Sequence, residues 1–115
     1  MSRPTLELWQ TEWCPASHRV RQRLTELGLT YVTHQVPVER ADRGELEKAT
    51  GRRTIPTLVA DGEVIDGEQP ILAYLQEHFI EPLDAQRQRA KAANAARAMQ
   101  KELEEACLKL AAATH

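Results

Sequence analysis

The chain has 115 residues, 42% of them hydrophobic, and 15 basic against 17 acidic residues leave a formal net charge of -2. This length fits one domain with its own core, and the near-neutral balance gives no electrostatic reason to expect nucleic acid as a partner. No apolar run approaches the roughly 20 residues that cross a bilayer, and no signal segment opens the chain, so we expect no membrane partner and a cytoplasmic protein with reduced thiols.

The first part of the chain predicts two strands joined by a helix. Residues 5–9 are rich in large apolar side chains, as in a short strand. Pro15 suits the first position of a helix, where its missing N–H costs nothing. Apolar residues then recur at helical spacing until a glycine ends the helix: Val20, Leu24, Leu27 and Gly28. The β-branched and aromatic residues at 30–34 predict the second strand.

The middle of the chain predicts a short helix, a hairpin and another helix. Residues 41–50 carry a short helical pattern that ends at a glycine. Two strand-like runs, 57–60 and 63–66, flank Asp61-Gly62, and an Asp-Gly pair favours a tight hairpin because the turn needs positive φ. An amphipathic helix follows over 68–79. The order β-α-β-α-β-β-α predicts an α/β domain with a four-stranded mixed sheet, its first two strands parallel, its last two antiparallel, and helices on both faces.

The last quarter of the chain predicts one long helix. Residues 84–113 contain neither glycine nor proline and are rich in alanine and charge. Their apolar positions alternate spacings of four and three, as in a heptad seam: Ala92, Ala96, Met99, Leu103, Ala106 and Leu110. We therefore divide the chain into a domain at 1–80 and a linker with a long amphipathic helix at 81–115. The seam is expected to pack on its own domain or to form a homodimer, and we favour the homodimer.

Cys14 is the candidate reactive thiol. It lies where the first strand gives way to a helix, and there free N–H groups and the helix dipole stabilise a thiolate. Such a position can lower the pKa of a cysteine from about 8.5 into the range of ~3.5–7.5. The alternative is a buried, inert cysteine, but Pro15 and polar Ser17 favour an exposed helix start. The only other cysteine, Cys107, falls within the long helix. A packing role is favoured there over a resolving role, and the two cysteines form neither a CxxC pair nor a zinc set.

Ile55-Pro56 is a second notable element, at the start of a predicted strand. Proline is tolerated at the first residue of a strand, and an X-Pro bond is the usual place for a cis peptide. A cis bond would turn the backbone of Ile55 outward, where it could pair with an extended peptide. An ordinary strand-starting proline is the alternative.

Taken together, these elements resemble glutaredoxins, in the thioredoxin-like superfamily, and the amino-terminal, glutathione-binding domain of glutathione transferases. The resemblance covers residues 5–79 and rests on Cys-Pro-x-Ser at 14–17, Thr-Gly-Arg-Arg-Thr-Ile-Pro at 50–56 and the Asp-Gly hairpin. The stretch 66–75 is similar to the transferase pattern Glu-Ser-x-Ala-Ile-x-x-Tyr-Leu, with Gln69 in place of serine. The resemblance implies a thioredoxin-like fold and glutathione as cofactor.

The resemblance also implies a set of glutathione-binding residues: Trp13, Ser17, Arg53, Ile55, Pro56, Glu68 and Gln69. Cys14 would form a mixed disulfide with glutathione, and Ile55, ahead of a cis Pro56, would hydrogen-bond its cysteinyl part through the backbone. Glu68 would meet the γ-glutamyl ammonium, while the α-carboxylate would meet helix N–H groups and the Gln69 amide. Arg53 is a candidate for the glycyl carboxylate, with a solvated loop as the equal alternative.

The chain departs from the family pattern around the thiol. Glutaredoxins commonly carry a lysine three positions before the cysteine, where this chain has Thr11, and Glu12 adds a negative charge that opposes a thiolate. Ala16 replaces an aromatic wall of the groove, for which Trp13 can partly compensate unless it merely packs at the strand end. Ser17 in place of a second cysteine excludes a local dithiol cycle, so any redox chemistry must be monothiol.

The leading interpretation is a monothiol, glutathione-dependent thiol-disulfide oxidoreductase that deglutathionylates proteins through Cys14. Its partners would be glutathione and glutathionylated proteins. The main alternative is a glutathione-binding, transferase-like interaction module with little or no catalysis, which Ala16 and the absent lysine favour. A true glutathione transferase ranks third, because the helical second domain is almost wholly missing. An iron–sulfur cluster bridged by two Cys14 thiolates and two glutathiones ranks fourth.

Overall fold

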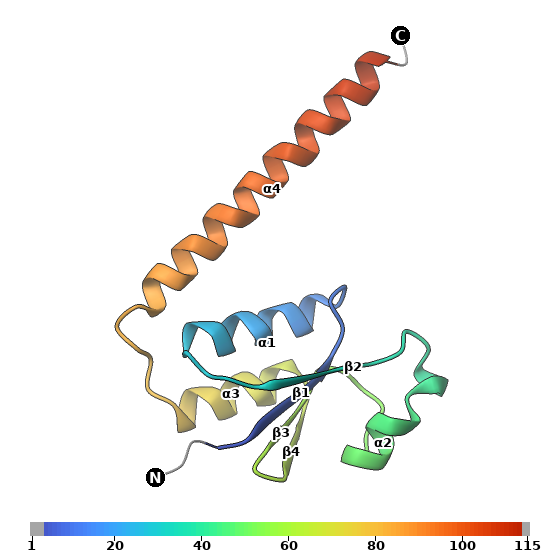
Figure 1. The fold of residues 1–115 in the computed structure, drawn as a ribbon, viewed down its shortest axis with the longest axis vertical. Coiled ribbons are helices and arrows are strands. Elements are labelled where there is room, and N and C mark those ends of the chain that lie inside the picture. The colour runs from blue at the N-terminus through green and yellow to red at the C-terminus, as the bar shows by residue number, and fades with distance from the viewer. Residues whose placement is uncertain (1–3, 114–115) are drawn as a thin grey trace. The chain divides into compact units, whose positions relative to one another are not determined.

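The computed structural model describes residues 4–113. The elements follow the chain in this order: β1 (Leu6–Gln10), α1 (Pro15–Glu26), β2 (Val32–Gln35), a 3-10 turn (Arg40–Asp42), α2 (Gly44–Thr50), β3 (Thr57–Ala60), β4 (Glu63–Asp66), α3 (Glu68–His78) and α4 (Ala85–Ala113) (Figure 1). This is the predicted order. Some bounds differ: β1 runs one residue later than the predicted 5–9, and α2 begins at Gly44 and not at residue 41. The second strand begins at Val32, and not at residue 30, because its parallel pairing with β1 runs from Glu7 opposite Val32 to Gln10 opposite Gln35.

The four strands form one mixed sheet in the order β2-β1-β3-β4. β1 and β2 are parallel, whereas β3 is antiparallel to both β1 and β4. The β3–β4 hairpin turns at Asp61 and Gly62, whose φ values of 48° and 85° are both positive, as the Asp-Gly signal predicts. The Asp61 carboxylate also accepts a 2.8 Å hydrogen bond from the N–H of Thr5, which ties the turn to the residue before β1. The predicted thioredoxin-like α/β fold is confirmed.

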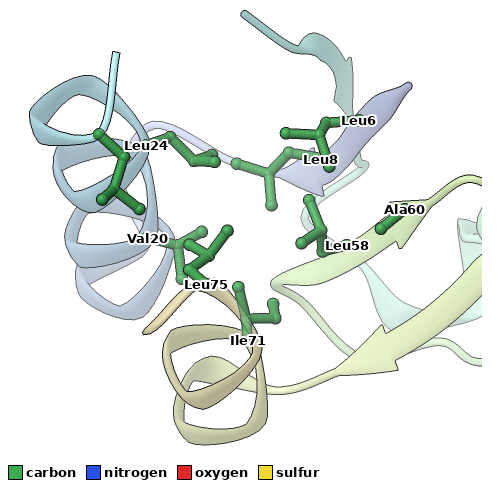
Figure 2. Close-up of a cluster of buried hydrophobic side chains, with 9 residues drawn as sticks. Leu6, Leu8, Val20, Leu24, Leu58, Ala60, Ile71 and Leu75 are labelled. Carbon is green, nitrogen blue, oxygen red and sulfur yellow. The ribbon is translucent and has the colours of Figure 1, made fainter. Parts of the chain in front are cut away.

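The two faces of the sheet carry separate apolar clusters. Successive side chains of β1 point to opposite faces, so Leu6 and Leu8 face one way and Trp9 the other. Leu6 and Leu8 belong to a buried cluster with residues of α1, β3 and α3 (Figure 2): Val20, Leu24, Leu58, Ala60, Ile71 and Leu75. Leu27, which follows α1, belongs to the same cluster. Trp9 packs with Val36 and with Leu46 of α2. The helices α1 and α3 thus pack side by side on one face, and α2 covers the other.

The chain separates into two compact units, one ending at Pro82 and the other beginning at Leu83. The second unit consists mainly of α4, a helix of 29 residues. Three large apolar residues of its heptad seam, Met99, Leu103 and Leu110, are exposed. Between residues 4 and 113, no helix is both long enough and apolar enough to cross a membrane.

Candidate functional site

Cys14 caps the N-terminus of α1. β1 ends at Gln10, and the chain turns through residues 11–13 before Cys14, which has extended backbone angles (φ −80°, ψ 118°) as an N-cap residue should. Pro15 then occupies the first helical position, where no N–H is required. The Cys14 sulfur accepts a contact of 3.5 Å from the N–H of Ser17. The thiol is partly exposed and free, so it combines access with a helix N-terminus.

The pKa of the Cys14 thiol lies below its ordinary value, although several influences oppose one another. Burial works against the charged form, while Ser17, the N–H of Ala16 and the charge of Arg19 favour it. The Ser17 hydroxyl is buried and has no hydrogen-bond partner among the described residues, so it can help only by rotating toward the sulfur. We therefore assign most of the contribution of Ser17 to its N–H, whose contact with the sulfur is present in the structure.

Arg19 is a site residue that the sequence analysis missed. Its guanidinium donates through Nε and Nη2 to the two carboxylate oxygens of Glu68, with Nη2 2.9 Å from Oε2. This ion pair joins α1 to the first residue of α3, and it keeps the pKa of Glu68 below its usual range. Because the same guanidinium also acts on the Cys14 thiol, it brings the predicted catalytic residue and a predicted glutathione-binding residue into one electrostatic group.

A second arginine, Arg21, lies near Glu12, whose negative charge was expected to oppose a thiolate at Cys14. Arg21 lies one turn after Ser17 with a largely buried side chain, and it donates to the Gln10 side chain and, at 3.2 Å, to the Thr11 carbonyl. Its Nη2 also lies 3.4 Å from the Glu12 carboxylate. The negative charge that sequence reasoning placed against the thiolate is therefore paired, and the segment before Cys14 is anchored to α1.

The loop that precedes β3 is joined to the start of α3. The Ile55–Pro56 bond is cis, as predicted. The Pro56 carbonyl accepts a 3.0 Å hydrogen bond from the N–H of Gly67, while the Asp66 carboxylate accepts one of 2.5 Å from the Thr54 hydroxyl. The backbone of Ile55 has no hydrogen-bond partner in the part of the chain that the structure describes. Its N–H and carbonyl are therefore available to a ligand.

The first turn of α3 offers further donors. Gly67 is the N-cap, with a φ of 100° that only glycine adopts readily, and it supplies no side-chain cap. The N–H groups of Glu68 and Gln69 thus begin the helix without a capping side chain, and the Gln69 side chain is exposed. Pro70 has no N–H, so the turn presents fewer donors than an ordinary helix start.

The remaining predicted binding residues differ in their placement. Trp13 stands next to Cys14 with 59% of its surface exposed, so it is not merely packed at the strand end. Arg53 is turned to the segment before and within α2. It pairs with the Glu47 carboxylate and donates to the carbonyls of Arg40 and Ala41 at 2.9 and 3.0 Å. These contacts stabilise that segment, and a glycyl carboxylate would have to share or displace them.

Comparisons with known proteins match the chain to glutaredoxins in sequence and to glutathione transferases in fold. A family model described as Glutaredoxin matches residues 6–65. Glutaredoxin 3 of Escherichia coli (strain K12) is 28% identical over 78 residues, covering 68% of this chain and 94% of that protein. A rice glutathione transferase solved in complex with glutathione aligns with a TM-score of 0.60 and 22% identity over 88% of this chain. Glutathione S-transferase 1-6 from Anopheles dirus species B aligns with a TM-score of 0.59 and 26% identity over 66% of it. The chain spans 49% and 37% of these two transferases.

Proposed function

The chain belongs to the glutaredoxin family, and on that premise we propose that it is a monothiol, glutathione-dependent thiol-disulfide oxidoreductase that removes glutathione from proteins. The observation that carries this proposal is the free Cys14 thiol at the N-terminus of α1, with a lowered pKa. A thiolate is the attacking species in disulfide exchange, so this position supplies the nucleophile that the reaction needs. The cycle also needs reduced glutathione, which is the condition of the cytoplasm.

The proposed cycle has two exchange steps at one sulfur. The Cys14 thiolate attacks the glutathione sulfur of a protein–glutathione disulfide, so that a new S–S bond forms while the old one breaks and the protein thiolate leaves with the electron pair. A second glutathione thiolate then attacks the glutathione sulfur bound to Cys14. This step releases glutathione disulfide and restores the Cys14 thiolate, and one proton passes to the protein thiolate that left. Ser17 stands where a second thiol would be, so Cys14 acts alone.

The surrounding residues support a glutathione-binding site beside this sulfur. In the proposal, the open backbone of Ile55 pairs with the cysteinyl part of glutathione, next to the cis Pro56. Glu68 and Gln69 take the γ-glutamyl end at the start of α3, whose two N–H groups favour a carboxylate. Trp13 forms an exposed wall next to the thiol. Arg53 remains the candidate for the glycyl carboxylate, in competition with its contacts to Glu47.

Turnover of a glutathionylated peptide tests this function. The purified chain is mixed with reduced glutathione and the mixed disulfide of glutathione with a cysteine-containing peptide, and glutathione disulfide is measured over time. We expect a rate that is proportional to the protein concentration and saturates with the peptide. A rate equal to that of glutathione alone would contradict the proposal and would favour the alternative, a glutathione-binding interaction module.

We further propose that α4 pairs with the same helix of a second copy. An isolated helix is marginal in water, and most helices in proteins are stabilised by a packed apolar face. The seam residues Met99, Leu103 and Leu110 are exposed, which leaves this face available. Alanines at the other seam positions would allow two helices to approach closely.

Light scattering on two matched variants tests the pairing. Leu103 lies on the seam, whereas Leu108 lies off it, and both side chains are exposed, at 57% and 71%. We expect the unmodified chain and Leu108→Glu to be dimers, and Leu103→Glu to be a monomer, because a charge in the seam would have to be buried. A monomeric unmodified chain at high concentration, or a dimeric Leu103→Glu, would overturn the pairing.

A further inference from the structure

The ion pair between Arg19 and Glu68 is coupled to the reactive thiol through the charge of Arg19. Each partner is near the N-terminal end of its helix, Arg19 in the second turn of α1 and Glu68 at the first position of α3. The side chain of Arg19 is 56% exposed and that of Glu68 is 17% exposed. The pair is therefore accessible mainly through its arginine, while the carboxylate lies deeper in the surface.

The Arg19–Glu68 ion pair leaves some hydrogen-bond donors and acceptors of both side chains unused. A guanidinium has five N–H donors, and Arg19 uses its Nε and Nη2 groups for Glu68. No other hydrogen bond of the Arg19 side chain occurs within residues 4–113, so the Nη1 edge is free. Each oxygen of Glu68 accepts one hydrogen bond from Arg19 and keeps lone pairs for another donor. A ligand can thus contact both partners without separating them.

We propose that Arg19 and Glu68 together recognise the free amino-acid end of the γ-glutamyl group, and that Arg19 determines the specificity for its α-carboxylate. This inference rests on the proposed function, in which glutathione binds next to Cys14. The α-ammonium and α-carboxylate sit on one carbon atom, and the protein offers an adjacent carboxylate and guanidinium. Bound in this way, the ligand carboxylate would meet the free edge of Arg19 and its ammonium would meet Glu68, so that four alternating charges attract one another.

Two features of the structure favour Arg19 over the other groups that could donate hydrogen bonds to the ligand carboxylate. The first turn of α3 lacks an N–H donor at Pro70, so its backbone alone can donate few hydrogen bonds to a carboxylate. The neighbouring arginines are committed elsewhere: Arg53 is bound to Glu47 and two carbonyls, and Arg21 to the segment before Cys14. A planar guanidinium edge also matches the geometry of a carboxylate, which a single ammonium does not.

Two mixed disulfides with the same leaving thiol provide the probes. One carries glutathione, and the other carries γ-aminobutyryl-cysteinylglycine, which keeps the ammonium and the chain length but lacks the α-carboxylate. The second-order rate constant of Cys14 with each probe is measured for the unmodified chain, for Arg19→Gln and for Lys48→Gln. Lys48 is exposed on α2, on the opposite face of the sheet, so its replacement removes one positive charge away from the site. The ratio of the two rate constants cancels any change in the reactivity of Cys14 itself.

We expect the unmodified chain and Lys48→Gln to react about fivefold to tenfold faster with the glutathione probe, the order expected for one charge-assisted contact at a partly exposed site. Arg19→Gln should bring the ratio close to one. If the unmodified chain shows the preference and Arg19→Gln keeps it, or if no preference exists although both probes react rapidly, the inference is overturned while the proposed function stands. If neither probe reacts faster than with an unstructured thiol, the proposed function itself fails.

Discussion

Replacement of Cys14 by serine is expected to lower the rate of thiol transfer by about a thousandfold or more, to the rate of free glutathione. A serine hydroxyl does not ionise near neutral pH and cannot form the mixed disulfide on which both exchange steps depend. The effect should be confined to activity. Cys14 is partly exposed, its sulfur makes one long contact with the Ser17 N–H, and serine is itself a preferred N-cap residue.

The matched control is Cys107→Ser, which removes the exposed cysteine of α4. Peptide turnover and thermal unfolding are measured for both variants and for the unmodified chain. Cys107→Ser should keep full turnover, and all three proteins should unfold at closely similar temperatures. Residual turnover in Cys14→Ser, or loss of turnover in Cys107→Ser, would remove Cys14 from its assigned role.

The reactivity of Cys14 should rise with pH around a midpoint below that of an unstructured cysteine. Only the thiolate attacks, so well below the pKa the rate increases about tenfold per pH unit, and above it the rate is constant. Since the folded protein lowers the pKa of Cys14, the plateau is reached at a lower pH. Alkylation by iodoacetamide in the Cys107→Ser background measures this midpoint, because that reagent does not titrate and only one thiol remains.

The reference for this titration is a peptide spanning residues 11–19, which keeps Cys14 and Arg19 but lacks the packed helix. Its midpoint should lie above that of the folded chain. In the folded chain, Arg19→Gln should move the midpoint upward, since the charge of Arg19 favours the thiolate, whereas Lys48→Gln should leave it in place. A folded-chain midpoint equal to that of the peptide would show that the start of α1 does not activate the thiol.

Much of the fold follows from local patterns in the chain. The helix after Cys14 was predictable because Pro15 and Gly28 mark its ends and its apolar spacing is regular. The hairpin was predictable because Asp61-Gly62 fits one turn type. The start of β2 was less predictable, since Tyr31 has the side chain of a strand residue. It instead packs on the apolar cluster, and the parallel register with β1 begins only at Val32.

The charged part of the site was harder to predict, because ion pairs between distant segments have no local signal. Arg19, Arg21 and Arg23 all lie on α1 and look alike in sequence, yet they pair with different partners. Which of them reaches Glu68, 49 positions along the chain, depends on how α1 and α3 pack against each other. The same holds for Arg53, whose direction toward Glu47 is set by the placement of α2.

The most direct measurement of the central claim is the location of the glutathione during turnover. The chain is mixed with the glutathionylated peptide in the absence of free glutathione, quenched with acid, digested and analysed by mass spectrometry. The proposed cycle predicts a glutathione mixed disulfide on the fragment that contains Cys14, which disappears when reduced glutathione is added before the quench. Glutathione found only on Cys107, or a peptide freed of glutathione with none bound to Cys14, would contradict it.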